Sequence, residues 1–393
     1  MLTRPPKAHP PRRPILEGVV EPPRILSARG LIPAVARESG ISAAETQILI
    51  YPSLAFAPRL PALTDFIANS APIVPLSRHP AWLNILQTSL GHEPYAIEAT
   101  AAGRTVGFLP LAFLDSILFG KFLVSLPYLN TNGVVAASPA VRTALVARAV
   151  SLAEELNVRH LELRHETAID HPGLNAQITS KVHMRLSLPK TTGQLWKGFT
   201  PKVRNQIRKG EKHPFMIAWG GAELVEPFYD VISRNMRDLG SPMYGIELFR
   251  EILNTFPGNA EICVVKDKDV PVAAALLLHG WGVTEVPTAS SLKEYNPSSV
   301  NMLMYWHLLQ RSAERGQQVF DFGRSTMEGN TFRFKKQWGA LPDPAIWQYC
   351  VNRGDVSEMR PDNPRYRRAI QIWQQLPLAL TRFLGPRIIR GIP

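Results

Sequence analysis

The second half of this chain repeats the order of elements predicted for the first half. Each copy consists of a β-hairpin, a helix and a strand, which the apolar spacing places at 95–113, 139–156 and 160–164, and again at 260–279, 299–315 and 319–322. The offset between the copies is about 160 to 165 residues throughout. At this length a single duplication predicts two similar domains in tandem and excludes a solenoid, which needs several shorter repeats.

A chain of 393 residues that is 45% hydrophobic can bury a sizeable core, which excludes a wholly disordered protein. We therefore expect a mixed α/β fold of the α+β class, in which each domain is a mixed β-sheet flanked by helices. The expected organisation is a flexible Pro/Arg-rich arm at 1–44, a first domain at 45–188, a second domain at 189–352 and a basic amphipathic tail at 353–393.

Cysteine content and hydropathy limit the cellular compartments in which this chain is expected. Two cysteines, Cys263 and Cys350, exclude a disulfide scaffold or a Cys-rich zinc module and fit a reducing compartment. The first residues contain no apolar run of signal-peptide length. The most apolar stretch, 106–124, is interrupted by proline, glycine and charged residues, so we expect two strands joined near Asp115 and Ser116, not a membrane span. The predicted location is the cytoplasm.

The formal net charge of +12 indicates an anionic partner, but it does not choose between nucleic acid, an anionic membrane and a phosphorylated small molecule. Part of this charge lies in the segment 199–213. A helix there would place Arg204 and Arg208 together, four residues apart, where they could grip a phosphate. The alternative is an ordinary solvated helix face.

A second segment that could carry chemistry spans 320–339. A strand ending at Asp321 is followed by a glycine turn with Arg324, and then by alternating aromatic and cationic residues that include Phe334, Lys335 and Trp338. Aromatic rings beside cations favour stacking combined with anion contact. A β-hairpin with a buried aromatic face explains the same alternation equally well.

Two further segments are weaker candidates. In the segment 295–301, which includes Tyr295, a helix that starts at Ser298 or Ser299 would present free backbone N–H groups to a phosphate or a developing oxyanion. In 125–133, Tyr128 and two asparagines, Asn130 and Asn132, could line a polar cleft, although turn formation alone accounts for the asparagines.

Several common chemistries have no matching motif in this chain. Neither half contains a dinucleotide fingerprint or a Walker loop, and no G-x-S-x-G or H-E-x-x-H motif occurs. His160, His165 and His171 are close in sequence, but their spacing suits no common zinc motif, so no metal is expected. Sequence-specific DNA binding is excluded because no recognition-helix unit is present.

Taken together, these residues resemble the Fem-type (FemAB-like) aminoacyltransferase family of peptidoglycan bridge formation, a branch of the GNAT acyltransferase superfamily with two tandem GNAT-like domains. The resemblance covers about residues 65–350 and is most specific from the helix at Ser298, through VFDFGRS, to FRFKKQWG. The segments SRHPAWLNIL and LFGKFLVSLPYLNTNG also look like Fem-like proteins found beside exosortase (PEP-CTERM) and exopolysaccharide systems. Two family features are missing, namely the long helical hairpin of some members and the usual GNAT pyrophosphate loop.

The resemblance implies an acyl- or aminoacyltransferase whose site lies in the second domain. Phe334 and Lys335 match the family's Phe-Lys pair, so Lys335 would stabilise charge at the tetrahedral intermediate, with Asp321 as base or amine-orienting group. The implied substrate-binding residues are Arg204, Arg208, Arg324, Phe334, Trp338, Tyr295 and Ser298.

The implied acceptor is an amine on an anionic, glycan-linked or nucleotide-linked molecule of the cell envelope or an exopolysaccharide. No bound cofactor is expected, and the donor is either aminoacyl-tRNA or acyl-CoA. The alternatives are an acyl-CoA-dependent N-acyltransferase and a non-catalytic Fem-like binding protein of polysaccharide or exosortase machinery. In the latter case the tail at 365–390, in which basic and apolar residues are interspersed, would hold the protein against the inner membrane.

Overall fold

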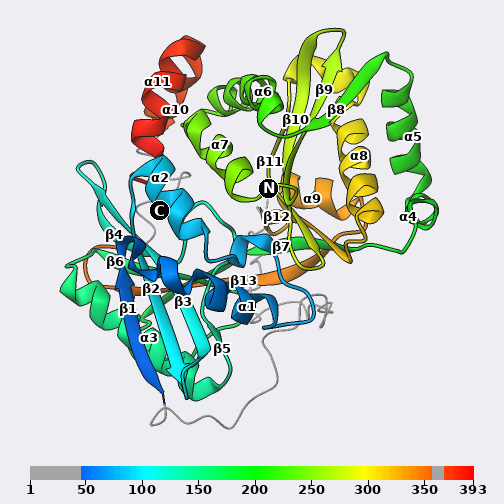
Figure 1. Ribbon diagram of the computed structural model, residues 1–393. Coiled ribbons are helices and arrows are strands. Elements are labelled where there is room, and N and C mark those ends of the chain that lie inside the picture. The colour runs from blue at the N-terminus through cyan, green and yellow to red at the C-terminus, as the bar shows by residue number, and fades with distance from the viewer. Residues whose placement is uncertain (1–45, 356–366) are drawn as a thin grey trace, which may run out of the picture.

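The computed structural model describes residues 46–355 and 367–393. The predicted arm at 1–44 lies outside these residues, as does the start of the predicted tail. The described residues form one continuous sheet of thirteen strands, with helices on both of its faces (Figure 1).

The strands divide between the two halves of the sequence. Those of the first half are β1 (Gln47–Pro52), β2 (Glu93–Ala101), β3 (Arg104–Ser116), β4 (Gly120–Val124), β5 (Val135–Ala136), β6 (His160–His165) and β7 (Ala176–Ser187). The others are β8 (Phe215–Gly220), β9 (Ala260–Asp267), β10 (Val270–His279), β11 (Val283–Ser291), β12 (Val319–Thr326) and β13 (Leu341–Val351).

The duplication is confirmed at the level of the fold. In the first half the antiparallel strands β2, β3 and β4 are followed by α3 (Pro139–Glu155) and by β6, which pairs in parallel with β4. In the second half β9, β10 and β11 are followed by α8 (Val300–Glu314) and by β12, which pairs in parallel with β11. The fold is therefore two tandem units of the same mixed α/β plan, as predicted.

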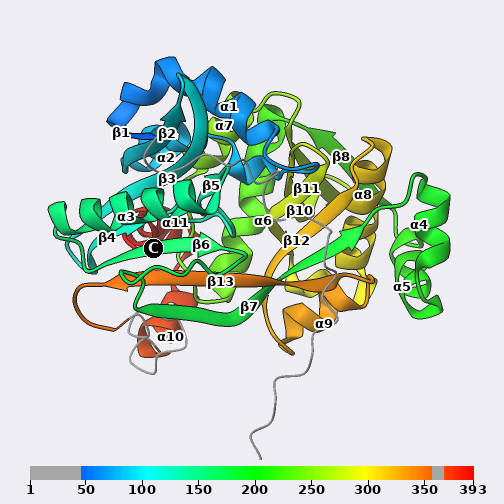
Figure 2. The same cartoon turned by 90° about the horizontal axis from the view of Figure 1, so that it is seen from below.

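The two units share their central strands, which the sequence did not predict. The sheet order across the middle is β6-β13-β7-β12, so β13, late in the chain, pairs with β6 of the first half (Figure 2). In turn β7, which follows β6 in sequence, pairs with β12 of the second half. The strand β13 follows the parallel pair of the second unit but completes the first unit. The strand β7 follows the parallel pair of the first unit but completes the second. The predicted boundary at 188 falls just after β7, and the boundaries themselves stay predictions.

The helices cover both faces of the sheet. Besides α3 and α8 they are α1 (Leu60–Ala68), α2 (Trp82–Leu90), α4 (Thr192–Gly198), α5 (Pro201–Glu211), α6 (Val225–Asp238), α7 (Ile246–Thr255), α9 (Asn330–Lys336), α10 (Arg367–Gln375) and α11 (Leu378–Ile389). One apolar core joins the halves, because residues of α1 and α2 pack with residues of α6 and α7; the Trp82 and Phe256 rings, for example, lie 5.5 Å apart. Two further cores lie under α3 and under α4, α5 and α8.

Several local predictions are confirmed and others are wrong. The stretch 106–124 is the pair β3 and β4, with its turn after Ser116, and no helix in the described ranges is long and apolar enough to cross a membrane. The aromatic–cation alternation at 332–338 is neither a hairpin nor a loop but lies in helix α9 and the turn after it. Phe332, Lys335 and Trp338 are its buried residues, at a spacing of three, which is helical and not the strand period of two.

The helix α8 begins one residue later than Ser299, which is itself in the left-handed region with φ +60°. Neither serine caps α8 by its side chain. The Ser298 hydroxyl donates to the Tyr295 carbonyl at 2.6 Å, and the Ser299 hydroxyl donates to Gln206 Oε1 at 2.9 Å. The helix therefore starts one residue after the later of the two predicted positions, with Ser299 as its N-cap residue but without a side-chain cap.

The tail folds back onto the second half. The helices α10 and α11 contact α6, and Arg382 of α11 pairs with Asp230 of α6. Gly385 of α11 lies close to Met243, since a Cβ on Gly385 would be 2.9 Å from the Met243 carbonyl oxygen. Ile372, Leu380 and Phe383 remain exposed. Membrane contact through this tail stays a prediction.

We expect Gly280→Ala to loosen the contact between the halves. Gly280 lies under the segment 73–79, where Val74 exchanges backbone hydrogen bonds with Trp281, and a Cβ would lie 2.4 Å from Leu76 N and 2.6 Å from Val74 O. Because both are backbone atoms, they cannot rotate away. The free energy of unfolding, measured by urea titration, should fall by about 1–3 kcal/mol. The control Gly193→Ala, with nothing within 4 Å of its Cβ, should change it little; equal losses would contradict the prediction.

Candidate functional site

The strands β11 and β12 separate within the second half. They pair in parallel from Val283 with Val319 to Glu285 with Asp321, and beyond this point each strand pairs only with its other neighbour. We call the opening that follows the β11–β12 split. It is lined by residues of both halves: Tyr128, Leu129, Asn130, Leu278, Glu285, Val286, Pro287, Asp321 and Gly323. The sequence segment 125–133 thus meets Asp321 and Gly323 of β12 in space.

Asp321 and Gly323 form an irregularity in β12 at the mouth of this split. The buried Asp321 carboxylate accepts a hydrogen bond from Gly323 N at 2.7 Å and another from Arg185 Nε at 2.9 Å. Gly323 has φ +79°, and a Cβ there would come within 3.1 Å of Asn130 Nδ2. Glycine is therefore required both by the backbone conformation and by the close approach of the first half. Asp321 lies inside β12, not at its end as expected.

Lys335 reaches this irregularity from α9. Its ammonium donates to the Gly323 carbonyl at 3.0 Å and to the Arg324 carbonyl at 3.1 Å. The side chain is buried, with 8% of the residue exposed, and this burial lowers the pKa of Lys335 to about 8, while the nearby Asp321 acts in the opposite direction. A buried ammonium with a spare donor direction is suited to stabilise a developing negative charge.

Glu285, which the sequence analysis missed, lies across the split from Asp321. Its Oε2 accepts a hydrogen bond from the Ser77 backbone N–H at 2.8 Å, so the first half holds this carboxyl in place. Burial, and secondarily the charge of Asp321, raises the pKa of Glu285 to about 7. A carboxyl that titrates near neutral pH can accept a proton during catalysis. The sequence signal was weak, since Glu285 is an acid in the mixed polar and apolar strand β11.

Arg185 lies behind the split and holds three carboxylates together. This residue of β7 is 1% exposed and pairs with Asp321, with Glu166 at 2.6 Å and with Asp343 at 3.2 Å. Its guanidinium holds the pKa of Glu166 well below the usual range despite burial. The cluster joins strands of both halves, and none of its members except Asp321 was singled out from the sequence. Since Asp321 is committed to Arg185 and Gly323, it is poorly placed to act as a free base.

The other predicted residues of the 320–339 segment pack instead of facing the split. The Arg324 guanidinium lies 3.4 Å from the centre of the Trp347 ring, and burial lowers its pKa to about 10. Phe334 and Trp338 join an aromatic cluster with Tyr305, whose ring lies 5.0 Å and 6.3 Å from theirs, respectively. These rings position α9, and through it Lys335, against α8.

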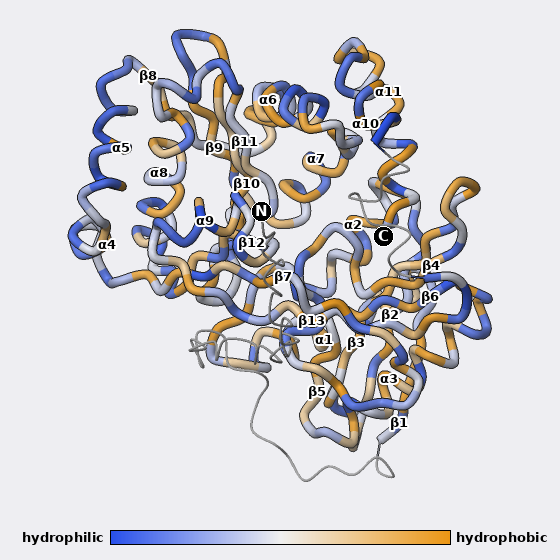
Figure 3. Tube along the Cα trace, turned by 180° about the vertical axis from the view of Figure 1, so that it is seen from behind, coloured by the Kyte–Doolittle hydropathy of each residue, from blue (hydrophilic) through white to orange (hydrophobic). Residues whose placement is uncertain are grey.

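The structure places the remaining predicted residues apart from the split. Arg204 and Arg208 lie on α5, a hydrophilic helix on the far side of α8 from the sheet (Figures 1 and 3). Arg204 donates to the Phe199 carbonyl, and Arg208 stacks on Trp196 at 5.5 Å. Tyr295 and Ser298 lie in the 3₁₀ turn before α8, with the Tyr295 ring beside Phe215. Phosphate binding by these four residues stays a prediction.

A larger apolar chamber adjoins the split. Its volume is about 350 Å³, and it shares Tyr128, Leu129 and Pro287 with the split. Most of its remaining lining comes from α2, α6, α7 and the segment 239–244 between α6 and α7, including Trp82, Leu86, Met236, Leu248 and Phe249. Among the described residues no three His, Cys, Asp or Glu side chains are placed to hold a metal ion. The site is therefore a polar split that opens onto an apolar chamber.

Solved structures of other proteins share the fold of this chain. A comparison with curated proteins gives no match. Of solved structures, FemX is 15% identical over 79% of this chain and 98% of its own, with a TM-score of 0.58. The C-terminal domain (DUF2156) of an Agrobacterium fabrum protein assigned as a lysylphosphatidylglycerol synthetase is 12% identical, covering 76% of this chain and 93% of its own, with a TM-score of 0.51. A conserved protein of unknown function from Bacteroides thetaiotaomicron is 10% identical over 75% and 97%, with a TM-score of 0.50.

At these identities the solved structures establish the fold and not the reaction. The sequence itself carries one further match, because residues 198–336 fit the family model of the acetyltransferase (GNAT) domain. This range holds β11, β12 and α9, and so includes Glu285, Asp321 and Lys335. Residues 198–336 are therefore similar to a GNAT acetyltransferase domain, and they hold most of the second of the two tandem units of the fold.

Proposed function

We propose that the chain transfers an acyl or aminoacyl group to an amine at the β11–β12 split. The observation that carries this proposal is the place of two groups where the parallel strands β11 and β12 part: Glu285, a carboxyl with its pKa near 7, lines the split, and the buried Lys335 ammonium donates to the Gly323 carbonyl beside it. A base and a positive charge near one opening are the two groups that acyl transfer needs.

In this mechanism the amine nitrogen attacks the carbonyl carbon of the donor, and the bond to the donor's sulfur or ribose oxygen breaks. Glu285 takes the proton that the amine loses and passes it to the leaving group. Lys335, anchored on the Gly323 and Arg324 carbonyls, stabilises the negative charge on the carbonyl oxygen or the leaving atom. We assign the base role to Glu285 instead of Asp321, since Asp321 serves to fix Gly323 and Arg185.

The apolar chamber is the proposed place for part of a substrate. Its lining favours an apolar moiety, such as an acyl chain, next to the transferred group. The names of the FemX and lysylphosphatidylglycerol synthetase structures support aminoacyl transfer to an envelope molecule, while the matched domain's description supports acetyl transfer. Both aminoacyl-tRNA and acyl-CoA therefore stay proposed donors, and an anionic envelope or exopolysaccharide acceptor in a cytoplasmic setting stays the proposed context.

The test is a transfer assay with aminoacyl-tRNA and with acyl-CoA as donors and a panel of amine acceptors, comparing wild type with Lys335→Met. We expect kcat at saturating acceptor to fall about 10²–10³-fold, because a preorganised positive charge is lost from the split. The control is Lys336→Met on the same helix, whose side chain is exposed and lies over Phe332, and which should keep its kcat. No transfer from either donor, or an unchanged kcat in Lys335→Met, would contradict the proposal.

A further inference from the structure

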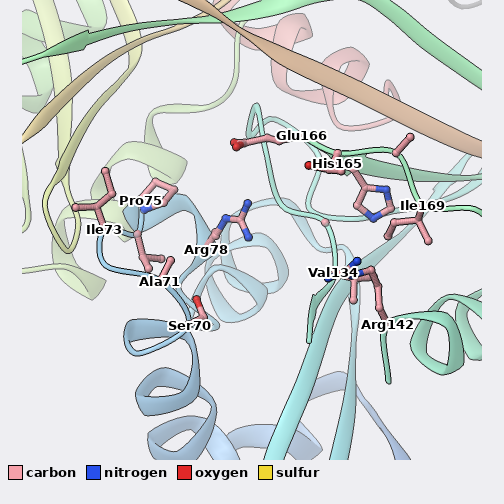
Figure 4. A pocket seen from close by; sticks show the side chains of 14 residues that line it. Ser70, Ala71, Ile73, Pro75, Arg78, Val134, Arg142, His165, Glu166 and Ile169 are labelled. Carbon is pink, nitrogen blue, oxygen red and sulfur yellow. The ribbon is translucent and has the colours of Figure 1, made fainter. Parts of the chain in front are cut away.

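We propose that a cavity in the first half of the chain binds a small ligand through an oxyanion that also carries a hydroxyl donor, such as a phosphate monoester, hydrogen phosphate or a 2-hydroxy carboxylate. The cavity has a volume of about 90 Å³ and lies between the segment before α2, the start of α3 and the end of β6 (Figure 4). It does not share a lining residue with the β11–β12 split. The site therefore goes beyond the proposed transfer reaction.

The first observation is a cation without a hydrogen-bonded partner. Arg78 points into the cavity from the segment before α2, and its Nε is buried with no hydrogen-bond acceptor (Figure 4). No ion pair or hydrogen bond of its guanidinium occurs among the described residues. The Glu166 carboxylate lines the same cavity and attracts Arg78, but its hydrogen bonds go to Arg185, at 2.6 and 3.2 Å. Burying an unpaired charge is costly, so an arginine held in this way indicates an anion that completes the site.

A second arginine enters from another element. Arg142, on the first turns of α3, lines the same cavity, and within the described ranges its side chain has no polar partner. Both Arg78 and Arg142 act on the His165 imidazole, since their charges lower its pKa in addition to the larger effect of burial, to about 4. Two guanidiniums without hydrogen-bonded partners thus line the same cavity as one neutral ring. Their planar forks match the oxygens of carboxylate or phosphate.

The third observation defines the ligand further. His165 is 5% exposed, and its Nε2 has no partner. The backbone of Ile169 orients the Gln348 amide. The Ile169 N–H donates to Gln348 Oε1 at 2.7 Å, and the Ile169 carbonyl accepts from Gln348 Nε2 at 2.9 Å. Since Gln348 Oε1 is an acceptor, His165 Nδ1, 3.1 Å away, carries the proton and donates to it. The free Nε2 of a neutral His165 is then an acceptor, which needs a donor on the ligand.

The local packing keeps this ring in place. A Cβ on Gly133 would lie 2.0 Å from His165 Cδ2, so the ring occupies the space that any side chain at position 133 would need. The cavity volume corresponds to roughly three waters at about 30 Å³ each, which is on the scale of one phosphate ion. Two cationic forks, the His165 acceptor and the Glu166 carboxylate, which is held by Arg185, therefore surround a space of suitable size.

Calorimetric titration of the full chain with inorganic phosphate tests the proposal, with sulfate as the matched anion that has no hydroxyl at pH 7.5. We expect saturable binding of one phosphate and at least about tenfold weaker binding of sulfate, because a charge-assisted or buried hydrogen bond is lost. Arg78→Met and Arg142→Met should each weaken phosphate binding at least about tenfold. The control Arg148→Met, also on α3 but already paired with Glu155, should bind phosphate as wild type does.

A thermal melt separates binding from folding. In phosphate-free buffer Arg78→Met should melt at or above the wild-type temperature, because an unpaired buried charge is removed, and it should lose the phosphate-dependent rise in Tm. Absence of phosphate binding to the wild type, binding unchanged in both arginine variants, or equal binding of sulfate would each overturn the proposal.

Discussion

Glu285→Gln is expected to reduce kcat for acyl or aminoacyl transfer by about 10²–10⁴-fold, because the amide cannot accept the proton that the attacking amine loses. Glutamine keeps the shape of the side chain, and its Oε1 can still accept the hydrogen bond from Ser77 N. The loss should therefore appear in kcat, with little change in KM for the donor. The measurement is steady-state transfer with whichever donor the wild-type enzyme uses.

The two altered pKa values also predict how transfer activity depends on pH. With a pKa of about 7, Glu285 is a base only above that pH, and with a pKa of about 8, Lys335 is an ammonium only below that one. Activity should rise with pH through about 7, fall through about 8 and peak between them. Glu285→Gln should remove the acidic limb, and Lys335→Met should remove the alkaline limb.

The protonation of Glu285 should affect stability in the direction opposite to its effect on activity, so that the protein loses stability as pH rises through about 7. Its folded-state pKa is raised above the ordinary 4.5, so the protonated form is favoured by folding; this contribution is complete below about pH 4.5 and is lost as pH rises through about 7. Glu285→Gln, which mimics the protonated form, should therefore gain stability relative to wild type between pH 5 and 8. Unchanged kcat, or an acidic limb that persists in the variant, would show that the base lies elsewhere.

The repeated part of the fold could be predicted from sequence because it depends on local patterns. The hairpin of β3 and β4, the helices α3 and α8 and the strand β12 all follow from apolar spacing within one short segment. The shared strands could not be predicted, because the pairing of β13 with β6 joins residues that are about 185 positions apart. Nothing within 341–351 alone indicates its partner.

The site divides in the same way. Lys335 was found because it matches a family motif, whereas Glu285 matches none and owes its altered pKa to Ser77, Asp321 and burial, which only the folded chain brings together. Phe332 and Phe334 alternate as they would in a strand, but it is Phe332, Lys335 and Trp338 that become buried together. Period-two spacing in a segment this short therefore misled the prediction toward a hairpin.

Arg185→Met is expected to have the largest effect on stability, because it removes the one cation that Glu166, Asp321 and Asp343 share. Methionine fills much of the same volume, so the cost is electrostatic: three carboxylates are left in a buried region without their partner. Breaking a buried pair by removing one member costs about 3–5 kcal/mol. The free energy of unfolding from urea titration at pH 7.5 measures this loss. Arg250→Met is the control, since Arg250 also contacts two carboxylates, Glu226 and Glu247, but at an exposed position, where the loss should stay below about 1 kcal/mol.

Acid should narrow the difference between Arg185→Met and wild type. In wild type the pKa of Glu166 is depressed by Arg185, so this contribution is present above the ordinary value of 4.5 and is lost as pH falls below it. Without Arg185 the buried carboxyls should take up protons at higher pH than in the unfolded chain, which relieves their repulsion and burial cost. The variant should thus approach wild-type stability below about pH 4. A loss under 1 kcal/mol at pH 7.5, or a difference that does not change with pH, would mean that solvent and not Arg185 compensates these charges. Because β7 and β13 carry Arg185 and Asp343 between the two halves, a large pH-dependent loss would place the electrostatic link between the halves directly behind the β11–β12 split.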